Sequence, residues 1–255
     1  MRAEVVERLL DINRGFYQSF AEPFRATRGR LQPGVARALE LVRLDANVLD
    51  LGCAHGALAE ALRERGFSGR YAGLDSSPPL LESVPDQLQP PRYQFALAEL
   101  GDAQWPEVAR TMLAQDAVTE QSAFERSSLF DWVFAFAVLH HLPSSELRKS
   151  AAAEIGALVR TEGHVVVSVW DFLASPRLRD RIVEWETVDL RDDEVDQGDY
   201  LVDWREGGSG VRYVHHFAED ELDEIAVTAG FRVAQKYRSD GENHKLGLYQ
   251  IWEIE

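Results

Sequence analysis

Residues 47–56 read NVLDLGCAHG, an apolar run with an aspartate near its end that leads directly into two glycines four positions apart. The apolar run predicts a buried strand at 46–51, and the amphipathic stretch that follows predicts a helix at 57–66. A glycine between strand and helix lets a ligand approach the backbone closely, and the first turn of the helix presents N–H groups without helical partners. The stretch therefore predicts a strand, turn and helix that together bind a ligand.

Short apolar runs alternate with helical patterns along the rest of the chain, which is typical of an α/β fold. The expected strands lie at 46–51, 70–74, 92–98, 131–138, 163–170, 231–237 and 246–253. The expected helices lie at 57–66, 78–88, 105–118, 144–160 and 218–229. This order predicts an open, doubly wound, Rossmann-like sheet of seven strands with helices on both faces, in which a hairpin-like connection joins the last two strands.

We expect one domain built from four parts. Residues 1–45 form N-terminal helices, 46–170 the ligand-binding core, 171–217 an insertion, and 218–255 a helix with the last two strands. Residues 119–130 are expected to be a loop or a frayed helix within the core. Open α/β sheets build their sites at the carboxyl ends of strands, so the N-terminal helices and the insertion are the candidate lid.

Composition limits the partners. The chain has 255 residues with 43 acidic against 27 basic side chains, a formal charge of −16 that repels polyanions. A nucleic-acid partner would need a local basic patch or a helper subunit, and charge alone favours a small-molecule or protein substrate. Without an apolar run of bilayer length or a signal-peptide pattern, we expect a cytoplasmic protein. The single cysteine, Cys53, excludes an intrachain disulfide, and no CxxC pair suggests a metal site.

Two acids follow the glycine turn at fixed places. Asp75 ends the second strand, where a carboxylate can accept both hydroxyls of a ribose, and Glu99 follows the third strand, within reach of an adenine amino group. Asp102 is an alternative to Glu99. The glycine pattern is D-x-G-x-x-x-G, with Ala54 where a dinucleotide site of the G-x-G-x-x-G type has its middle glycine.

In this order and spacing, VLDLGCAHGALAEAL, GLDSS, FDWVFAFAVLHHL and EGHVVVSVW resemble the class I S-adenosylmethionine-dependent methyltransferases. The resemblance covers residues 46–170 and implies an enzyme of that fold, with S-adenosylmethionine as cofactor and S-adenosylhomocysteine as product. It places Asp50 and the two turn glycines at the methionine end, Asp75 at the ribose and Glu99 at the adenine. The full set of implied cofactor-binding residues is Asp50, Gly52, Cys53, Ala54, Gly56, Asp75, Ser76, Glu99, Leu100, Phe136 and Ala137, the last two beneath the sulfonium.

Several residues of this region have simpler alternatives, since Asp50 can merely cap the following helix and Asp75 can be an ordinary turn residue. Cys53 is expected to pack as a small side chain, because methyl transfer needs no covalent step. His140 is a candidate general base, but the HH pair can simply be the end of the fourth strand, with one ring facing the cofactor and the other packed.

A second resemblance extends beyond the core. FYQSFAEPFRATRGRLQP, SVWDF, GDYLVDW, RYVHHF and SDGENH are similar, in this order, to segments of the Trm9-like methyltransferases, which act on the carboxymethyl group of modified wobble uridines in tRNA. The matching positions are Arg28, Tyr200, Trp204, Arg212, Tyr213, His215 and Asn243. The resemblance implies that Arg28 and Arg212 orient an acceptor carboxylate and that Tyr213 or Trp204 stacks on a flipped base. Surface arginines and core aromatics are the alternative interpretation.

The sequence alone therefore does not identify the methyl acceptor. A tRNA carboxymethyl group, a small acid, amine or hydroxyl compound, and a non-catalytic role as a regulatory subunit that binds S-adenosylmethionine are all compatible with the sequence. The Trm9-like resemblance also implies a small activator protein as a partner. The candidate catalytic residues are Arg28, His140, Arg212 and Tyr213.

Overall fold

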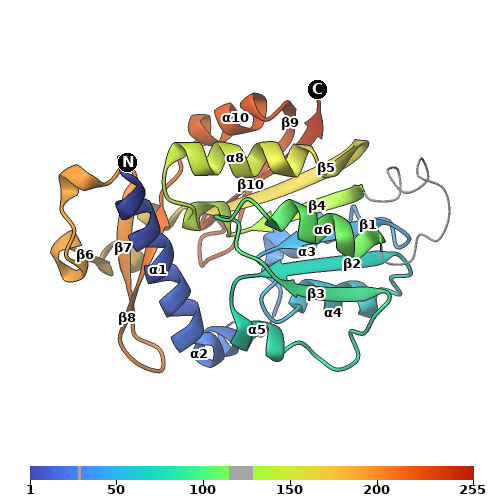
Figure 1. Cartoon of the computed structure of the whole chain (residues 1–255), viewed down its shortest axis with the longest axis horizontal. Coiled ribbons are helices and arrows are strands. Elements are labelled where there is room, and N and C mark those ends of the chain that lie inside the picture. The colour runs from blue at the N-terminus through green and yellow to red at the C-terminus, as the bar shows by residue number, and fades with distance from the viewer. Residues whose placement is uncertain (28–29, 115–128) are drawn as a thin grey trace.

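The computed structural model describes residues 1–27, 30–114 and 129–255 of the chain (Figure 1). The large sheet contains β1 (Asn47–Leu51), β2 (Arg70–Asp75), β3 (Tyr93–Leu97), β4 (Phe130–Phe136), β5 (Val159–Trp170), β9 (Phe231–Ser239) and β10 (Gly247–Ile254). The α-helices outside the insertion are α1 (Ala3–Ser19), α2 (Ala21–Ala26), α3 (Pro33–Leu39), α4 (Ala57–Glu64), α5 (Pro78–Glu82), α6 (Trp105–Ala114), α8 (Ser145–Gly156) and α10 (Glu219–Thr228).

The seven strands lie in the order β3-β2-β1-β4-β5-β10-β9. The first five are parallel, and β10 runs antiparallel between β5 and β9. The direction in which consecutive strands are added reverses at β1 and β4, and open α/β sheets bind ligands at such a switch point. The NVLDL strand and its glycine turn therefore end at the position where a site is expected.

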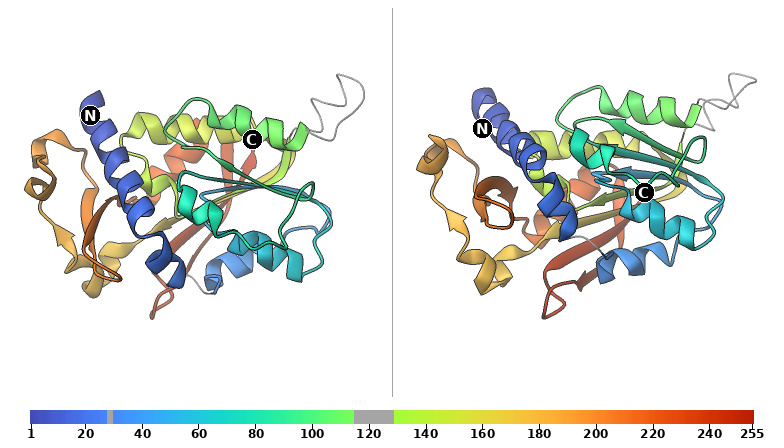
Figure 2. Two further views of the ribbon diagram at one scale, coloured as in Figure 1. Left: turned by 60° about the horizontal axis from the view of Figure 1, so that its bottom comes forward. Right: turned by 90° about the horizontal axis from the view of Figure 1, so that it is seen from below.

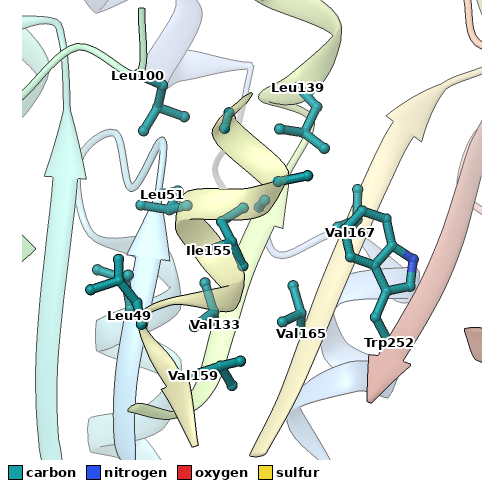
Figure 3. Close-up of a cluster of buried hydrophobic side chains, with 14 of the residues drawn as sticks. Leu49, Leu51, Leu100, Val133, Leu139, Ile155, Val159, Val165, Val167 and Trp252 are labelled. Atoms are coloured by element: carbon teal, nitrogen blue, oxygen red, sulfur yellow. The ribbon is translucent and has the colours of Figure 1, made fainter. Parts of the chain in front are cut away.

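Alternation along each strand feeds two separate cores, one on each face of the sheet. On β1, Leu49 and Leu51 belong to the cluster beneath α6, α8 and α10, whereas Val48 belongs to the cluster beneath α3 and α4. Figure 3 shows the first cluster, where Ile155 of α8 lies over the strands and the ring of Trp252 of β10 lies beside Val167 of β5. This burial of both faces confirms the predicted architecture.

The insertion forms a second, three-stranded antiparallel sheet, which the sequence interpretation did not assign. Its order is β6 (Ile182–Val183), β7 (Asp199–Trp204) and β8 (Gly210–His215), and the glycine-rich REGGSG stretch makes the β7–β8 turn. Before it come α9 (Pro176–Arg179) and the short helix η2 (Phe172–Ala174); η3 (Trp185–Val188) and η4 (Asp192–Glu194) lie between β6 and β7. Helix α1 lies across β8, between this sheet and the core (Figure 2).

Several predicted boundaries were wrong by a few residues. The helix expected at 78–88 ends at Glu82, and the helix expected at 144–160 ends at Gly156, because the backbone turns there and enters β5 at Val159. The helix expected at 105–118 is described to Ala114. Its remainder and most of the loop expected at 119–130 lie outside the described residues.

Candidate active site

A cavity of about 360 Å³ lies at the carboxyl ends of β1, β2, β4 and β5. Its volume is in the range of small-molecule sites. The predicted residues on its wall are Asp50, Gly52, Cys53, Ala54, Asp75, Ser76, Glu99, Leu100, Phe136, Ala137, His140 and Arg212. Two further walls come from α1, which belongs to the N-terminal helices expected as part of the lid, and from the β9–β10 hairpin, which was not included in that lid.

The glycine turn adopts the backbone that its sequence predicts. Gly52 has φ of +74°, and a Cβ there would lie 3.0 Å from Cγ2 of Val138. Ala54 also has a left-handed backbone, with φ of +48°, so it takes the conformation that the usual glycine would adopt without strain. Gly56, with φ of +79°, precedes α4 and is not on the cavity wall; it lets the helix begin against Phe95 and Leu88.

The Asp75 carboxylate is held by the backbone of two turns. Its Oδ2 accepts the N–H of Ala54 at 2.8 Å and its Oδ1 accepts the N–H of Ser77 at 2.8 Å. Burial raises the pKa of Asp75, and these backbone hydrogen bonds oppose the increase. Each carboxylate oxygen has a second lone pair, so the group can still accept two hydroxyl protons from a ligand.

Asp50 is a buried acid at the end of β1. The Tyr71 hydroxyl donates to its Oδ2 at 2.6 Å. Burial raises the pKa of Asp50 to about 7, despite the hydrogen bond from Tyr71. The neighbouring Cys53 packs against Gly73, where a Cβ would come within 2.9 Å of its Sγ, and burial raises the pKa of its thiol. Cys53 therefore occupies the position as a small packed side chain and remains a thiol.

Glu99 reaches the cavity and is bonded to the N-terminal helix. Arg14 of α1 donates to Glu99 Oε2 through Nη2 at 2.9 Å and through Nε at 3.3 Å. The alternative acid, Asp102, accepts the N–H of Gln104 at the start of α6 and is not on the cavity wall. The structure thus places Glu99, and not Asp102, on the same cavity wall as Leu100 and the glycine turn.

The two histidines after β4 have different hydrogen bonds. His140 Nδ1 accepts the N–H of Trp170 at 3.3 Å, so its neutral ring carries the proton on Nε2. His141 Nδ1 donates to the carbonyl of Tyr213 at 3.1 Å, and its Nε2 accepts the Tyr17 hydroxyl at 2.8 Å. Burial, with the charge of Arg212, lowers the pKa of His141 to about 3, so this ring is neutral.

Arg212 lies on the cavity wall among aromatic rings. Its guanidinium carbon is 4.7 Å from the ring centroid of Trp170, 5.4 Å from that of Phe16 and 5.6 Å from that of Trp204. The side chain is 6% exposed, which places a cation where an anionic ligand would be desolvated. The other predicted arginine, Arg28, lies outside the described residues, and Arg30 is on the wall.

The other residues of the second resemblance are not on the wall. Tyr213 is fully buried, and its hydroxyl donates to Asp199 at 2.7 Å. Trp204 packs edge-on against Phe16, and Tyr200 packs against Phe172. His215 is buried beside Asp199, and Asn243 is exposed in the β9–β10 turn. Stacking on a base by Tyr213 or Trp204 would need a rearrangement of these contacts.

Three polar residues of α1 were missed by the sequence interpretation. Besides Arg14, Tyr17 bonds His141, and Asn13 accepts the N–H of Tyr213 through Oδ1 while its Nδ2 donates to the carbonyl of His141. All three lie on the cavity wall. Their signal in the sequence is only a polar strip at positions 13, 14 and 17 beside an apolar helix face.

The β9–β10 hairpin contacts α3 and forms another wall of the cavity. Asp240 accepts the N–H of Gly34 at 2.9 Å and the hydroxyl of Tyr249, so it joins the start of α3 to β10. Tyr249 also stacks on Tyr237 with 4.8 Å between ring centroids. Asp240 and Tyr249 are on the cavity wall, which this hairpin therefore closes on the side of α3.

These residues fit the S-adenosylmethionine that the sequence leads us to expect. The wall provides an ordered carboxylate at the end of β2 for a ribose, a close backbone approach at Gly52, and Leu100 beside Glu99 for a base. Within the described ranges, no group of histidine, cysteine and acidic side chains is arranged to hold a metal ion. None of the described helices combines the length and the apolar character needed to cross a bilayer.

Comparisons with known proteins agree with this geometry. The family model described as a methyltransferase domain matches residues 24–236. A tRNA (carboxymethyluridine(34)-5-O)-methyltransferase of Arabidopsis thaliana is 29% identical over 154 residues, which are 60% of this chain but only 31% of that relative.

Two solved structures illustrate the likeness in fold. A Burkholderia thailandensis 1,6-didemethyltoxoflavin-N1-methyltransferase, with its acceptor and S-adenosylhomocysteine bound, has a TM-score of 0.60 at 18% identity, covering 100% of this chain and 92% of that one. A putative methyltransferase in complex with the Haloferax volcanii Trm112 methyltransferase activator has a TM-score of 0.61 at 15% identity, covering 94% and 96%.

Proposed function

This chain belongs to the methyltransferase domain family, and from that premise we propose that it methylates a carboxylate oxygen, that of the carboxymethyl group on a modified tRNA wobble uridine. The chain is an enzyme, and S-adenosylmethionine is its methyl donor. The observation that carries the choice of acceptor is Arg212, a buried cation on the cavity wall. An arginine fork can bind both oxygens of a carboxylate and so fix its orientation.

The chain's own residues then act by binding and positioning. Asp75 and Gly52 hold the nucleoside and the methionine end, and Arg212 orients the acceptor carboxylate. A carboxylate is already nucleophilic at neutral pH, so no proton has to be removed. This agrees with the two histidines, since His141 is neutral with both ring nitrogens bonded and His140 has its proton on Nε2. We therefore propose His140 as a hydrogen-bond donor to the acceptor instead of a general base.

We propose that α1 and the inserted sheet together form the lid of this site. Helix α1 supplies a wall of the cavity, and Arg212 lies on β8 of the inserted sheet. Their closure would exclude water from the transferred methyl group, as lids of other enzymes do.

The tRNA acceptor rests on the Arabidopsis relative, while the charge of −16 favours a second candidate, a small-molecule carboxylic acid. An acidic enzyme needs a helper to approach tRNA, so we also propose a small activator protein as a partner. The fold shared with the methyltransferase bound to the Trm112 activator supports this proposal. We also propose a cytoplasmic location, where modified tRNA serves translation.

The test is transfer of labelled methyl groups from S-adenosylmethionine to tRNA that carries unmethylated carboxymethyluridine, with a small-metabolite extract in parallel. We expect base-labile label in tRNA, increased by added activator. Label in the extract alone would overturn the tRNA acceptor and favour the small acid.

The variant Arg212→Lys separates acceptor binding from donor binding. Because lysine lacks the bidentate fork, we expect the KM for the acceptor to rise about tenfold or more, with the affinity for S-adenosylhomocysteine retained. Arg205→Lys, at an exposed arginine in the β7–β8 turn, is the matched control. An unchanged KM in Arg212→Lys would contradict the role of Arg212.

A further inference from the structure

A network of buried charges lies outside the cavity, between the inserted sheet and two helices of the core. His215 of β8 donates through Nδ1 to Asp199 of β7 at 2.7 Å and through Nε2 to Glu221 of α10 at 3.0 Å. Glu221 also pairs with Arg148 of α8 at 3.3 Å. The side chains of His215 and Arg148 are each 2% exposed and that of Asp199 is fully buried, whereas that of Glu221 is 30% exposed, so water is excluded from the contact between His215 and Asp199.

The hydrogen bonds require a protonated His215. Both ring nitrogens face carboxylates, which can only accept, so both must carry hydrogen. In that state two cations, His215 and Arg148, balance two anions, Asp199 and Glu221. Loss of the imidazole proton would leave a net negative charge and a nitrogen lone pair facing a carboxylate in a buried site, which is costly.

The network reaches the cavity at two points. Arg148 donates through Nη1 to the carbonyl of Leu142, a residue of the cavity wall. Asp199 accepts the hydroxyl of Tyr213, whose carbonyl accepts the Nδ1 proton of His141. Both connections end in the turn after β4, and Tyr213 directly follows Arg212 on β8.

We propose that His215 is a positioning residue, whose protonated ring holds the inserted sheet against α8 and α10 and thereby keeps β8 and the turn after β4 in place around the cavity. The proposal goes beyond the proposed function and rests on it only in assigning the acceptor to the Arg212 side. It predicts that β8 loosens as pH rises, whatever the acceptor is.

The direction of the pH effect follows from the groups around the ring. These are Asp199 of β7, Glu221 of α10 and Arg148 of α8, while Tyr213 of β8 is joined through Asp199. Burial lowers the pKa of His215, but the hydrogen bonds to Asp199 and Glu221 outweigh it and leave this pKa raised. Because the pKa is raised, the inserted sheet is held fully against α8 and α10 below the ordinary histidine pKa near 6.5. This contact is lost as the pH rises through the higher pKa that His215 has in the folded state.

The experiment compares the wild type with His215→Gln and with the control His216→Gln. His216 pairs with Asp171 at 3.1 Å and takes no part in the network. Histidine ring signals in NMR spectra, assigned with the two variants, give the titration of His215. Hydrogen exchange of the peptides that cover 139–142 and 199–215, corrected for the intrinsic pH dependence of exchange, measures how firmly β8 and the turn after β4 are held in place.

We expect the His215 signal to titrate above pH 6.5 and the exchange of both segments to rise through the same range. His215→Gln should exchange fast at every pH, and His216→Gln should behave as the wild type. A His215 ring that is neutral at pH 6, or exchange that does not follow its titration, overturns the proposal.

Two further measurements distinguish failure of this proposal from misfolding of His215→Gln and from failure of the proposed function. Glu221→Gln retains the shape of the network but removes one anion. It should therefore shift the His215 titration and the pH at which exchange increases to lower values together. An unchanged exchange transition in this variant overturns the proposal, even if His215→Gln does not fold. Binding of S-adenosylhomocysteine at pH 6 tests donor binding separately, because it depends on the β1 and β2 turns. Its absence in the wild type would refute the proposed function without touching the exchange result.

Discussion

Replacing Asp75 by asparagine tests the central assignment of the cavity. Both carboxylate oxygens accept backbone N–H groups at 2.8 Å, from Ala54 and from Ser77. Asparagine has one acceptor oxygen, so its NH₂ group must face one of these donors and leaves it unpaired. An unpaired buried N–H costs about 1–3 kcal/mol, and this is the expected loss in the free energy of unfolding.

The same substitution removes an acceptor for the ribose. Hydrogen bonds to a charged group contribute about 1.5–3 kcal/mol, so affinity for S-adenosylhomocysteine should fall about 10- to 100-fold. Calorimetric titration measures the affinity, and urea unfolding measures the stability. Asp102→Asn is the matched control, since Asp102 also accepts a backbone N–H but lies off the cavity wall. A variant Asp75→Asn that loses stability yet binds within twofold of the wild type would refute the ribose role.

Two other substitutions test the glycine turn and the buried acid. Gly52→Ala should lower the free energy of unfolding by about 1–3 kcal/mol, and by more than the control Gly66→Ala. Both glycines have positive φ, but a Cβ at Gly52 would lie 3.0 Å from Val138, whereas nothing lies within 4 Å of a Cβ at Gly66. Equal losses in the two variants would contradict the contact with Val138. The pKa of Asp50 is about 7 in the folded state and about 4 in the unfolded state, so between these values only the folded state keeps the proton. The free energy of unfolding of the wild type should therefore decrease as the pH rises from about 4 to about 7, by up to about 4 kcal/mol from this group. Asp50→Asn should lack that part of the fall in urea unfolding, and parallel curves for the two proteins would contradict it.

The sequence predicted the large sheet and most of one wall of the cavity. Apolar runs and the glycine turn depend on local chemistry, so the seven strands, Gly52 and Asp75 could be placed from patterns a few residues long. The cofactor-binding roles of these residues remain predictions.

The α1 wall and the second sheet could not be predicted in the same way. Asn13 and Arg14 meet Tyr213 and Glu99, which are 200 and 85 positions away, and helical periodicity does not say which polar residue will meet a cavity. In β7 the buried positions of DYLVDW do not alternate regularly, because α1 packs on one side and the insertion on the other, so the strand gave no period of two. Tyr213 resembles a site residue in sequence, yet its hydroxyl is used by Asp199.

The contact between α1 and β8 has a consequence for synthesis of the protein. Asn13 leaves the ribosome 200 residues before its partner Tyr213. At typical elongation rates of about 5–20 residues per second, the apolar face of α1 waits about 10–40 seconds for β8. Until then the part of the cavity wall that β8 supplies through Arg212 is missing, so the cavity of a nascent chain is incomplete on that side.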